Sequence, residues 1–251
     1  LNPGDEVIIP RPYWVTFPES VKLAGGIPKF AAPSKGFQLD IDVVKDLIGP
    51  KTKAIVVNSP NNPSGAIYPA HILSQLLSLA KENDFMIISD EAYEGFIYDE
   101  ETPFSLTSFD KETLNNTIAV QTFSKTFSMT GFRIGYAIAS IPWIGYLKNL
   151  GGHQVGNICT FAQYGALKAL SLTEGEMRPY VKALKERRDL AFDLFGSLFD
   201  CYKPKGGFFL FPNVSSYIEE GRFTSSQSMA MEILEKTHVA VLPGEAFGLA
   251  E

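Results

Sequence analysis

The sequence predicts an α/β fold in which a mainly parallel sheet is flanked by helices and followed by part of a smaller α+β domain. Short β-branched segments alternate with longer segments of helical period up to about residue 150. Polar clusters directly follow several of the apolar segments. They would lie at the carboxyl ends of the strands, which is where parallel sheets bind ligands. Beyond that point long helical segments replace the alternation. We expect a large domain over residues 1–155, and over 156–251 its remainder with a partial C-terminal small domain.

Each element is expected from its local pattern. Runs of apolar or β-branched residues predict strands at Glu6–Pro10, Ile27–Ala31, 53–58, 85–89, 117–121 and 134–139. Apolar residues at helical spacing predict helices at 13–23, 40–48 and Ala70–Asn83, the first two ended by glycine. In the second half the same patterns predict helices at 160–171, 176–199 and 225–236, and strands at 207–212 and 239–242.

Composition excludes several classes of protein. The net charge is −6 over 251 residues and there is no Lys/Arg-rich run, so nucleic-acid binding is not expected. The apolar runs are too short to span a bilayer, so no membrane insertion is expected. Cys159 and Cys201 have unrelated surroundings, which indicates neither a metal site nor a disulfide framework and favours a cytoplasmic location.

The strongest chemical signal is the segment Ser-Lys-Thr-Phe-Ser-Met-Thr-Gly-Phe-Arg over residues 124–133. Lys125 follows a predicted buried strand in a hydroxyl-rich turn, where partial desolvation favours the free amine that condenses with an aldehyde. Arg133 could clamp a phosphate dianion with two parallel hydrogen bonds. Taken alone, the two residues are better explained as a surface lysine and a surface arginine that flank a loop.

Other polar and aromatic residues stand at the ends of the neighbouring strands. Asp90 could pair with a pyridinium nitrogen, and Tyr93 could reach a ring's phenolic oxygen; the alternative is a helix cap beside a packed tyrosine. Asn62, in the turn over residues 58–65, could donate to the same oxygen or belong to a plain connection. Trp14 could stack on a flat ring or fill a core.

The order of these motifs resembles one family. Asn-Pro-Ser-Gly, Asp-x-x-Tyr, and Ser-Lys with an arginine eight residues on are similar to the class I/II aminotransferases, the aspartate aminotransferase-like enzymes of fold type I that use pyridoxal 5′-phosphate (PLP). The resemblance runs from Gly4-Asp-Glu-Val, through Arg187-Arg188 and Gly206-Gly207-Phe-Phe, to the segment over residues 241–248.

The resemblance implies a role for each residue. Lys125 would be the catalytic lysine that forms the Schiff base with PLP. Asp90 would pair with the pyridine nitrogen, and Tyr93 and Asn62 would bind the phenolic oxygen. The remaining cofactor contacts would be Trp14 on the ring and Thr122, Ser124 and Arg133 at the phosphate, with Thr122 standing where the family usually has Gly or Ser. A cis peptide bond before Pro63 is also implied.

The implied activity is transfer of an amino group between an amino acid, aspartate or aromatic, and a 2-oxo acid in a homodimer. A PLP-dependent lyase or synthase on the same fold, or an aminotransferase-like regulatory domain, would share these residues. The family's phosphate loop would precede Leu1, and its arginine for the substrate α-carboxylate would follow Glu251, so we expect the 251 residues to be part of a longer enzyme.

Overall fold

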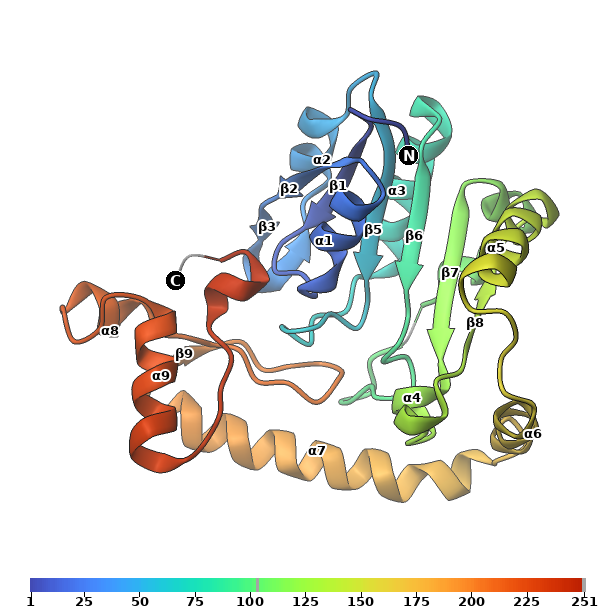
Figure 1. The fold of residues 1–251 in the computed structure, drawn as a ribbon. Helices are drawn as coiled ribbons and strands as arrows, with labels where there is room; N and C mark the ends of the chain where they lie inside the picture. Colours follow the sequence, from blue (N-terminus) through green and yellow to red (C-terminus); the bar gives the residue numbers. More distant parts are fainter. Residues whose placement is uncertain (103, 250–251) are drawn as a thin grey trace.

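The computed structural model describes residues 1–102 and 104–249, and its centre is a six-stranded sheet (Figure 1). The strand order is β2-β1-β5-β6-β7-β8; neighbours are parallel except for β8, which runs antiparallel to β7. The strands of this sheet are β1 (Glu6–Pro10), β2 (Ile27–Ala31), β5 (Thr52–Asn58), β6 (Met86–Asp90), β7 (Thr117–Thr122) and β8 (Gly135–Ile138). The mainly parallel sheet that the sequence predicts is therefore confirmed.

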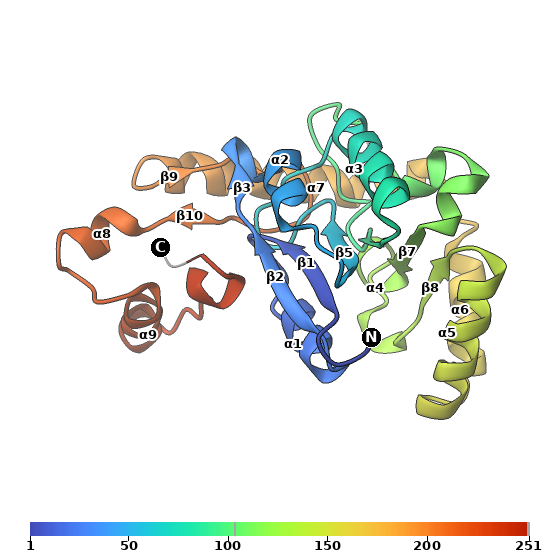
Figure 2. The ribbon, with the colours of Figure 1, turned by 90° about the horizontal axis from the view of Figure 1, so that it is seen from above.

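Helices cover both faces of this sheet, with α2 and α3 on one face and α1 on the other (Figure 2). The first face buries the larger core cluster, which includes Ile55, Leu76 and Ile87, and the second buries a smaller cluster around Ile9 and Val56. The helices are α1 (Thr16–Leu23), α2 (Ile41–Leu47), α3 (Ala70–Asn83), α4 (Phe123–Thr126), α5 (Ile141–Gln154), α6 (Thr160–Ala169), α7 (Glu174–Gly196), α8 (Ser215–Glu219) and α9 (Ser226–Thr237).

Two small antiparallel pairs lie outside the sheet. They are β3 (Pro33–Ser34) with β4 (Gln38–Leu39), and β9 (Asp200–Cys201) with β10 (Pro212–Asn213). Helix α7 runs beneath the carboxyl ends of the parallel strands, and the segment between β9 and β10 enters the space between them (Figure 1). The edge of the sheet where the sequence places the polar clusters therefore faces the second half of the chain.

Most expected elements of the first half are present. The strands at Glu6–Pro10 and Ile27–Ala31 and the helix at Ala70–Asn83 have the expected bounds. The first helix begins at Thr16 rather than at residue 13, and the N–H of Tyr13 donates to the carbonyl of Phe247 (3.1 Å). The peptide bond before Pro63 is cis, as expected.

The prediction of a strand over residues 207–212 is wrong for residues 207–211. Gly207 has a φ of +70°, and its N–H donates to the carbonyl of Phe96 (2.9 Å), so the backbone bonds to a loop. The rings of Phe208 and Phe209 pack against Tyr93 instead of lining a sheet face. The apolar side chains of this run therefore contact another side chain rather than a neighbouring strand.

The prediction of a strand over residues 239–242 is also wrong. Within the described part of the chain these residues pair with no strand, and β-propensity without a partner strand forms no ladder. Helix α5 was not predicted, although Ser140 before it and Pro142 in its first turn are start signals. Its weakly periodic, glycine-containing sequence explains the omission.

Candidate active site

The candidate site is built at the carboxyl ends of three adjacent strands, β5, β6 and β7. Asn58 at the end of β5 is in register with Asp90 at the end of β6, and its amide donates to the Asp90 carbonyl (3.0 Å). β7 ends at Thr122, and Lys125 follows two residues later. Parallel alignment thus brings an acid, an amide-rich turn and an amine to one edge of the sheet.

Lys125 lies on the short helix α4 rather than in an irregular turn. The Thr122 hydroxyl caps this helix by accepting from the Ser124 N–H (3.1 Å), and it lies 2.9 Å from the Ser124 hydroxyl. The Lys125 amine lies 5.9 Å from the ring centre of Tyr93 and 5.8 Å from that of Phe208. Within residues 1–102 and 104–249 this amine has neither a hydrogen bond nor an ion pair, so it is available to a ligand.

The hydroxyl of buried Tyr93 accepts a hydrogen bond from the amide of Asn62 (3.3 Å). Burial raises the pKa of Tyr93 to about 12, opposed by the Asn62 hydrogen bond and reinforced by the charge of Asp90. The phenol is therefore neutral at ordinary pH, and its proton remains free to be donated. Asn62 is held in turn, because its N–H donates to the side-chain oxygen of Asn58 (2.7 Å).

Asp90 has one carboxylate oxygen bonded to the N–H of Ala92 (3.0 Å). Burial is the largest influence on this group and raises its pKa to about 6; the Ala92 hydrogen bond and the Lys125 charge oppose the shift, and Glu91 adds to it. A carboxyl that is costly to ionise in this way gains from a cationic partner. Asp90, Tyr93 and Lys125 thus influence one another electrostatically and form the centre of the site.

Two expected residues lie at its margin. Trp14 is 41% exposed and meets Phe17 edge to face (5.4 Å between ring centres). Its turn is tied to the site, since the amide of Asn61 donates to the carbonyl of Pro12 (3.1 Å). Arg133 is exposed, and its guanidinium donates to the carbonyl of Thr130 (3.0 Å), so the structure does not bring it into contact with Lys125 or Asp90.

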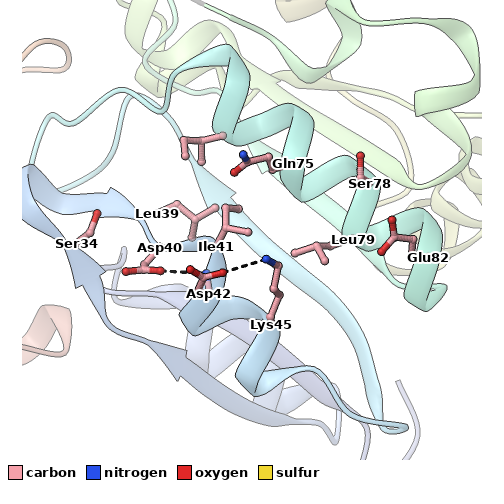
Figure 3. Close-up of a pocket in the computed structure, with 11 residues that line it drawn as sticks. Ser34, Leu39, Asp40, Ile41, Asp42, Lys45, Gln75, Ser78, Leu79 and Glu82 are labelled. Atoms are coloured by element: carbon pink, nitrogen blue, oxygen red, sulfur yellow. Dashed lines mark hydrogen bonds and ion pairs between the residues drawn. The ribbon is translucent and has the colours of Figure 1, made fainter.

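A hollow of about 590 Å³ lies elsewhere, between α2 and α3 (Figure 3). Its lining includes Asp40, Lys45 and Glu82, and none of the predicted site residues. Asp40 and Lys45 are already bonded to Asp42, the first by its N-cap contact and the second by an ion pair of 3.0 Å. The candidate site is therefore identified by the chemistry at the strand ends and not by this hollow.

A family profile described as aminotransferase class I and II matches residues 1–251. The chain belongs to the class I and II aminotransferases. Curated relatives of this aminotransferase chain include a probable aspartate/prephenate aminotransferase of Aquifex aeolicus, 42% identical over 99% of this chain and 64% of that protein. An aspartate aminotransferase of Bacillus sp. (strain YM-2) is 38% identical, with the same coverage of each.

The solved structure of an aromatic aminotransferase from Pyrococcus horikoshii OT3 superposes on this aminotransferase chain with a TM-score of 0.92. It is 36% identical and covers 100% of this chain and 67% of its own. The chain thus spans about 64% of the length of the two curated relatives. Class I and II aminotransferases depend on PLP.

The residues at the strand ends fit that cofactor. Lys125 offers an unpaired amine, Asp90 a desolvated carboxyl suited to a ring N–H⁺, and the Asn62–Tyr93 pair two donors for an anionic ring oxygen. The described residues contain no helix long and apolar enough to cross a bilayer and no cluster of His, Cys, Asp and Glu suited to a metal ion.

Sequence reasoning missed four residues around this site. Buried Glu91 and Gln121 and half-buried Glu94 form a hydrogen-bonded cluster behind Asp90, and Phe208 packs beside Lys125. The sequence contains a signal for Glu91 and Gln121. Alternation along β6 and β7 places these two side chains on the same buried face as Ser89 and Ala119. Phe208 had none, since its approach depends on how distant segments pack.

Proposed function

We propose that the whole protein transfers an amino group between an amino acid and a 2-oxo acid, with PLP bound covalently to Lys125. The observation that carries the proposal is the unpaired Lys125 amine beside Tyr93 and Asp90 at the edge of a parallel sheet. The relatives' names, aspartate, aspartate/prephenate and aromatic aminotransferase, support an aspartate or aromatic amino donor.

The chain's own groups would divide the work. Bound PLP supplies an electron sink that stabilises negative charge at the substrate's α-carbon. Asp90 would hold the proton on the ring nitrogen, and the neutral Tyr93 hydroxyl with the Asn62 amide would donate to the phenolic oxygen. Lys125 would carry a proton to and from the α-carbon, because its amine is the unpaired base at the site.

The margin of the site would bind the rest of the cofactor. The hydroxyls of Thr122 and Ser124 would contact the phosphate, together with the Arg133 guanidinium, which has further N–H donors besides the one bonded to the Thr130 carbonyl. Trp14 would stack on the ring. These roles rest on family resemblance and on the shared strand edge.

The domain division, the homodimer and the cytoplasmic location belong to the same proposal. Residues 1–155 would form most of the cofactor-binding large domain, and 156–251 its remainder with part of the small domain; residues 250 and 251 lie outside the described part. Exposed apolar side chains on α5 and α6, such as Tyr146 and Phe161, support a covered surface in the assembly. Analytical ultracentrifugation of the full chain tests the dimer.

The test of the central proposal is trapping of PLP by borohydride reduction of the full chain, followed by mass spectrometry of the peptide that contains Lys125. We expect the label on Lys125 in the wild type, none in Lys125→Ala, and an unchanged label in the exposed control Lys168→Ala. Transamination by Lys125→Ala should fall about a thousandfold or more, because it loses its proton carrier.

Two outcomes would count against the proposal. Retention of the label in Lys125→Ala would remove the lysine's assignment. Continued release of product from an amino acid alone, beyond one equivalent for each bound PLP and without any 2-oxo acid to receive the amino group, would indicate a lyase in place of an aminotransferase.

A further inference from the structure

The acid and the amine of the proposed site emerge from neighbouring strands, so their spacing depends on how the ends of β6 and β7 are held together. Asp90 is paired with Val120 in the last register position of the two strands. Past it, the N–H of Glu91 donates to the carbonyl of Val120 (3.0 Å). The main chains then separate, one toward Tyr93 and the other into α4.

Two side chains continue the connection where the main chains part. Strand alternation directs Glu91 and Gln121 to the face opposite Asp90 and Thr122. Both are buried, at 4% and 7% exposed, and the Gln121 amide donates to a Glu91 carboxylate oxygen (2.9 Å). The other Glu91 oxygen accepts from the Ser89 hydroxyl (2.9 Å), which anchors it to β6.

Both N–H groups and the oxygen of the Gln121 amide have hydrogen-bond partners. Its second N–H donates to Glu94 (2.8 Å), and its oxygen accepts from the hydroxyl of Tyr136 on β8. These bonds favour one orientation of the amide, because reversing it would turn its oxygen toward the side-chain oxygens of Glu91 and Glu94. The cluster is therefore a rigid cross-link and not a set of loose polar contacts.

We propose that Glu91 and Gln121 are positioning residues that set the distance between Asp90 and Lys125. The inference rests on the proposed function, since it concerns the acid and amine of that site. Neither side chain lies on the face that presents Asp90. They act through the strand ends, and a displacement of about 1 Å between reacting groups is enough to slow a reaction about a hundredfold.

The test compares three variants of the full chain loaded with PLP. Glu91→Leu removes the acceptor, Gln121→Met removes the donor at similar volume, and Glu91→Gln keeps an oxygen that accepts from Gln121. We expect kcat to fall about 10- to 100-fold in the first two, with the KM for the amino acid within about threefold, and Glu91→Gln to stay near wild type.

A second readout separates positioning from general damage. Because Asp90 would fix the ionisation of the ring, the pH midpoint of the cofactor's absorbance change should move by about one pH unit in Glu91→Leu and Gln121→Met. It should stay in place in Glu94→Gln, a matched control that keeps an acceptor for Gln121 and leaves the Glu91 bond intact. If Glu91→Leu does not fold, Gln121→Met carries both measurements.

The outcomes are distinguishable. Wild-type kcat and an unmoved midpoint in Gln121→Met would overturn the positioning role while leaving the proposed function intact. Failure of the wild type to bind PLP at Lys125 would overturn the proposed function itself. A loss of activity in Glu91→Gln equal to that in Glu91→Leu would also contradict the inference, because it would show that the charge matters and not the hydrogen bond.

Discussion

Residues 1–140 and residues 141–249 bury their apolar side chains very differently. The first region packs isoleucine, valine, leucine and phenylalanine on both faces of the sheet. In the second, the buried apolar residues are Ala162, Ala166, Ala169, Ala230 and Phe247, while many larger ones on its helices are exposed. The first region is thus held by its own core, and the second by particular contacts with the first.

Those contacts are concentrated where the second region meets the candidate site. The N–H groups of Lys205 and Gly206 both donate to the carbonyl of Gly65 (3.0 Å each). Gly65 has a φ of +69°, and a Cβ on it would lie 2.5 Å from the Cβ of Pro204, so this approach requires glycine. The difference between the regions teaches that the well-packed first region can position the residues of a ligand site, while the second region packs against that site from outside.

The largest effect is expected from a substitution in the core of the first region. Phe85 is 1% exposed and packs in the cluster between the sheet and α3. Phe85→Ala should lower the free energy of unfolding by about 3–5 kcal/mol through lost burial and a cavity. The contrasting variant Leu194→Ala, at an exposed position of α7, should change it by about 0.5 kcal/mol or less. Chemical denaturation checks both, and equal losses would abolish the distinction between the regions.

A smaller effect is expected where the second region is attached. The buried guanidinium of Arg188 on α7 donates to the carbonyl of Pro204 (2.6 Å) and pairs with Asp99 (2.7 Å) in the first region. Arg188→Met should lower the free energy of unfolding by about 1–3 kcal/mol. This is less than the loss for a fully buried ion pair, because Asp99 is partly exposed and water can solvate its carboxylate.

The adjacent exposed residue gives the control for that measurement. Arg187→Met should leave the denaturation midpoint nearly unchanged. Limited proteolysis should cut Arg188→Met first in the second region. Cleavage that begins instead in the strands of the first region would show that the two regions do not unfold separately.

The smallest expected effect concerns how the stability of the first region depends on pH. Burial, reinforced by the charge of Glu91, raises the pKa of Glu94 from 4.5 to about 7. The folded chain therefore binds a proton that the unfolded chain has released, and this group's contribution to stability falls as pH rises from about 4.5 to about 7. Asp90, with a pKa raised from 3.8 to about 6, contributes in the same direction.

Glu94→Gln removes one of these titrations. We expect melting temperatures measured without PLP to fall less between pH 4.5 and 7.5 in Glu94→Gln than in the wild type. The difference between the two falls is the contribution of the Glu94 titration. Identical pH profiles would show that Glu94 is not buried beside Glu91 in solution.

Sequence patterns predicted the first region well, because its elements are long or continuous enough to carry their own signals. The helix Ala70–Asn83 shows helical spacing of leucines, and the strand at Thr52–Asn58 contains the continuous apolar run Ala54–Val57. Sequence patterns wrongly predicted strands at residues 207–211 and 239–242. The apolar side chains there suit a strand, but the described part of the chain supplies no partner strand. Helix α5 was missed because its apolar residues are spread around it.

By itself the sequence determined which chemical groups follow which strands: Asp90 after β6, Lys125 after β7 and Asn62 in the turn after β5. Such adjacency is local, and parallel strands share one carboxyl edge, so these groups gather without further information. Only the tertiary structure decided that Gln121 bonds Glu91 and that Phe208 packs beside Lys125. Those contacts depend on strand register and on the path of a distant segment, which are set by packing of the whole chain.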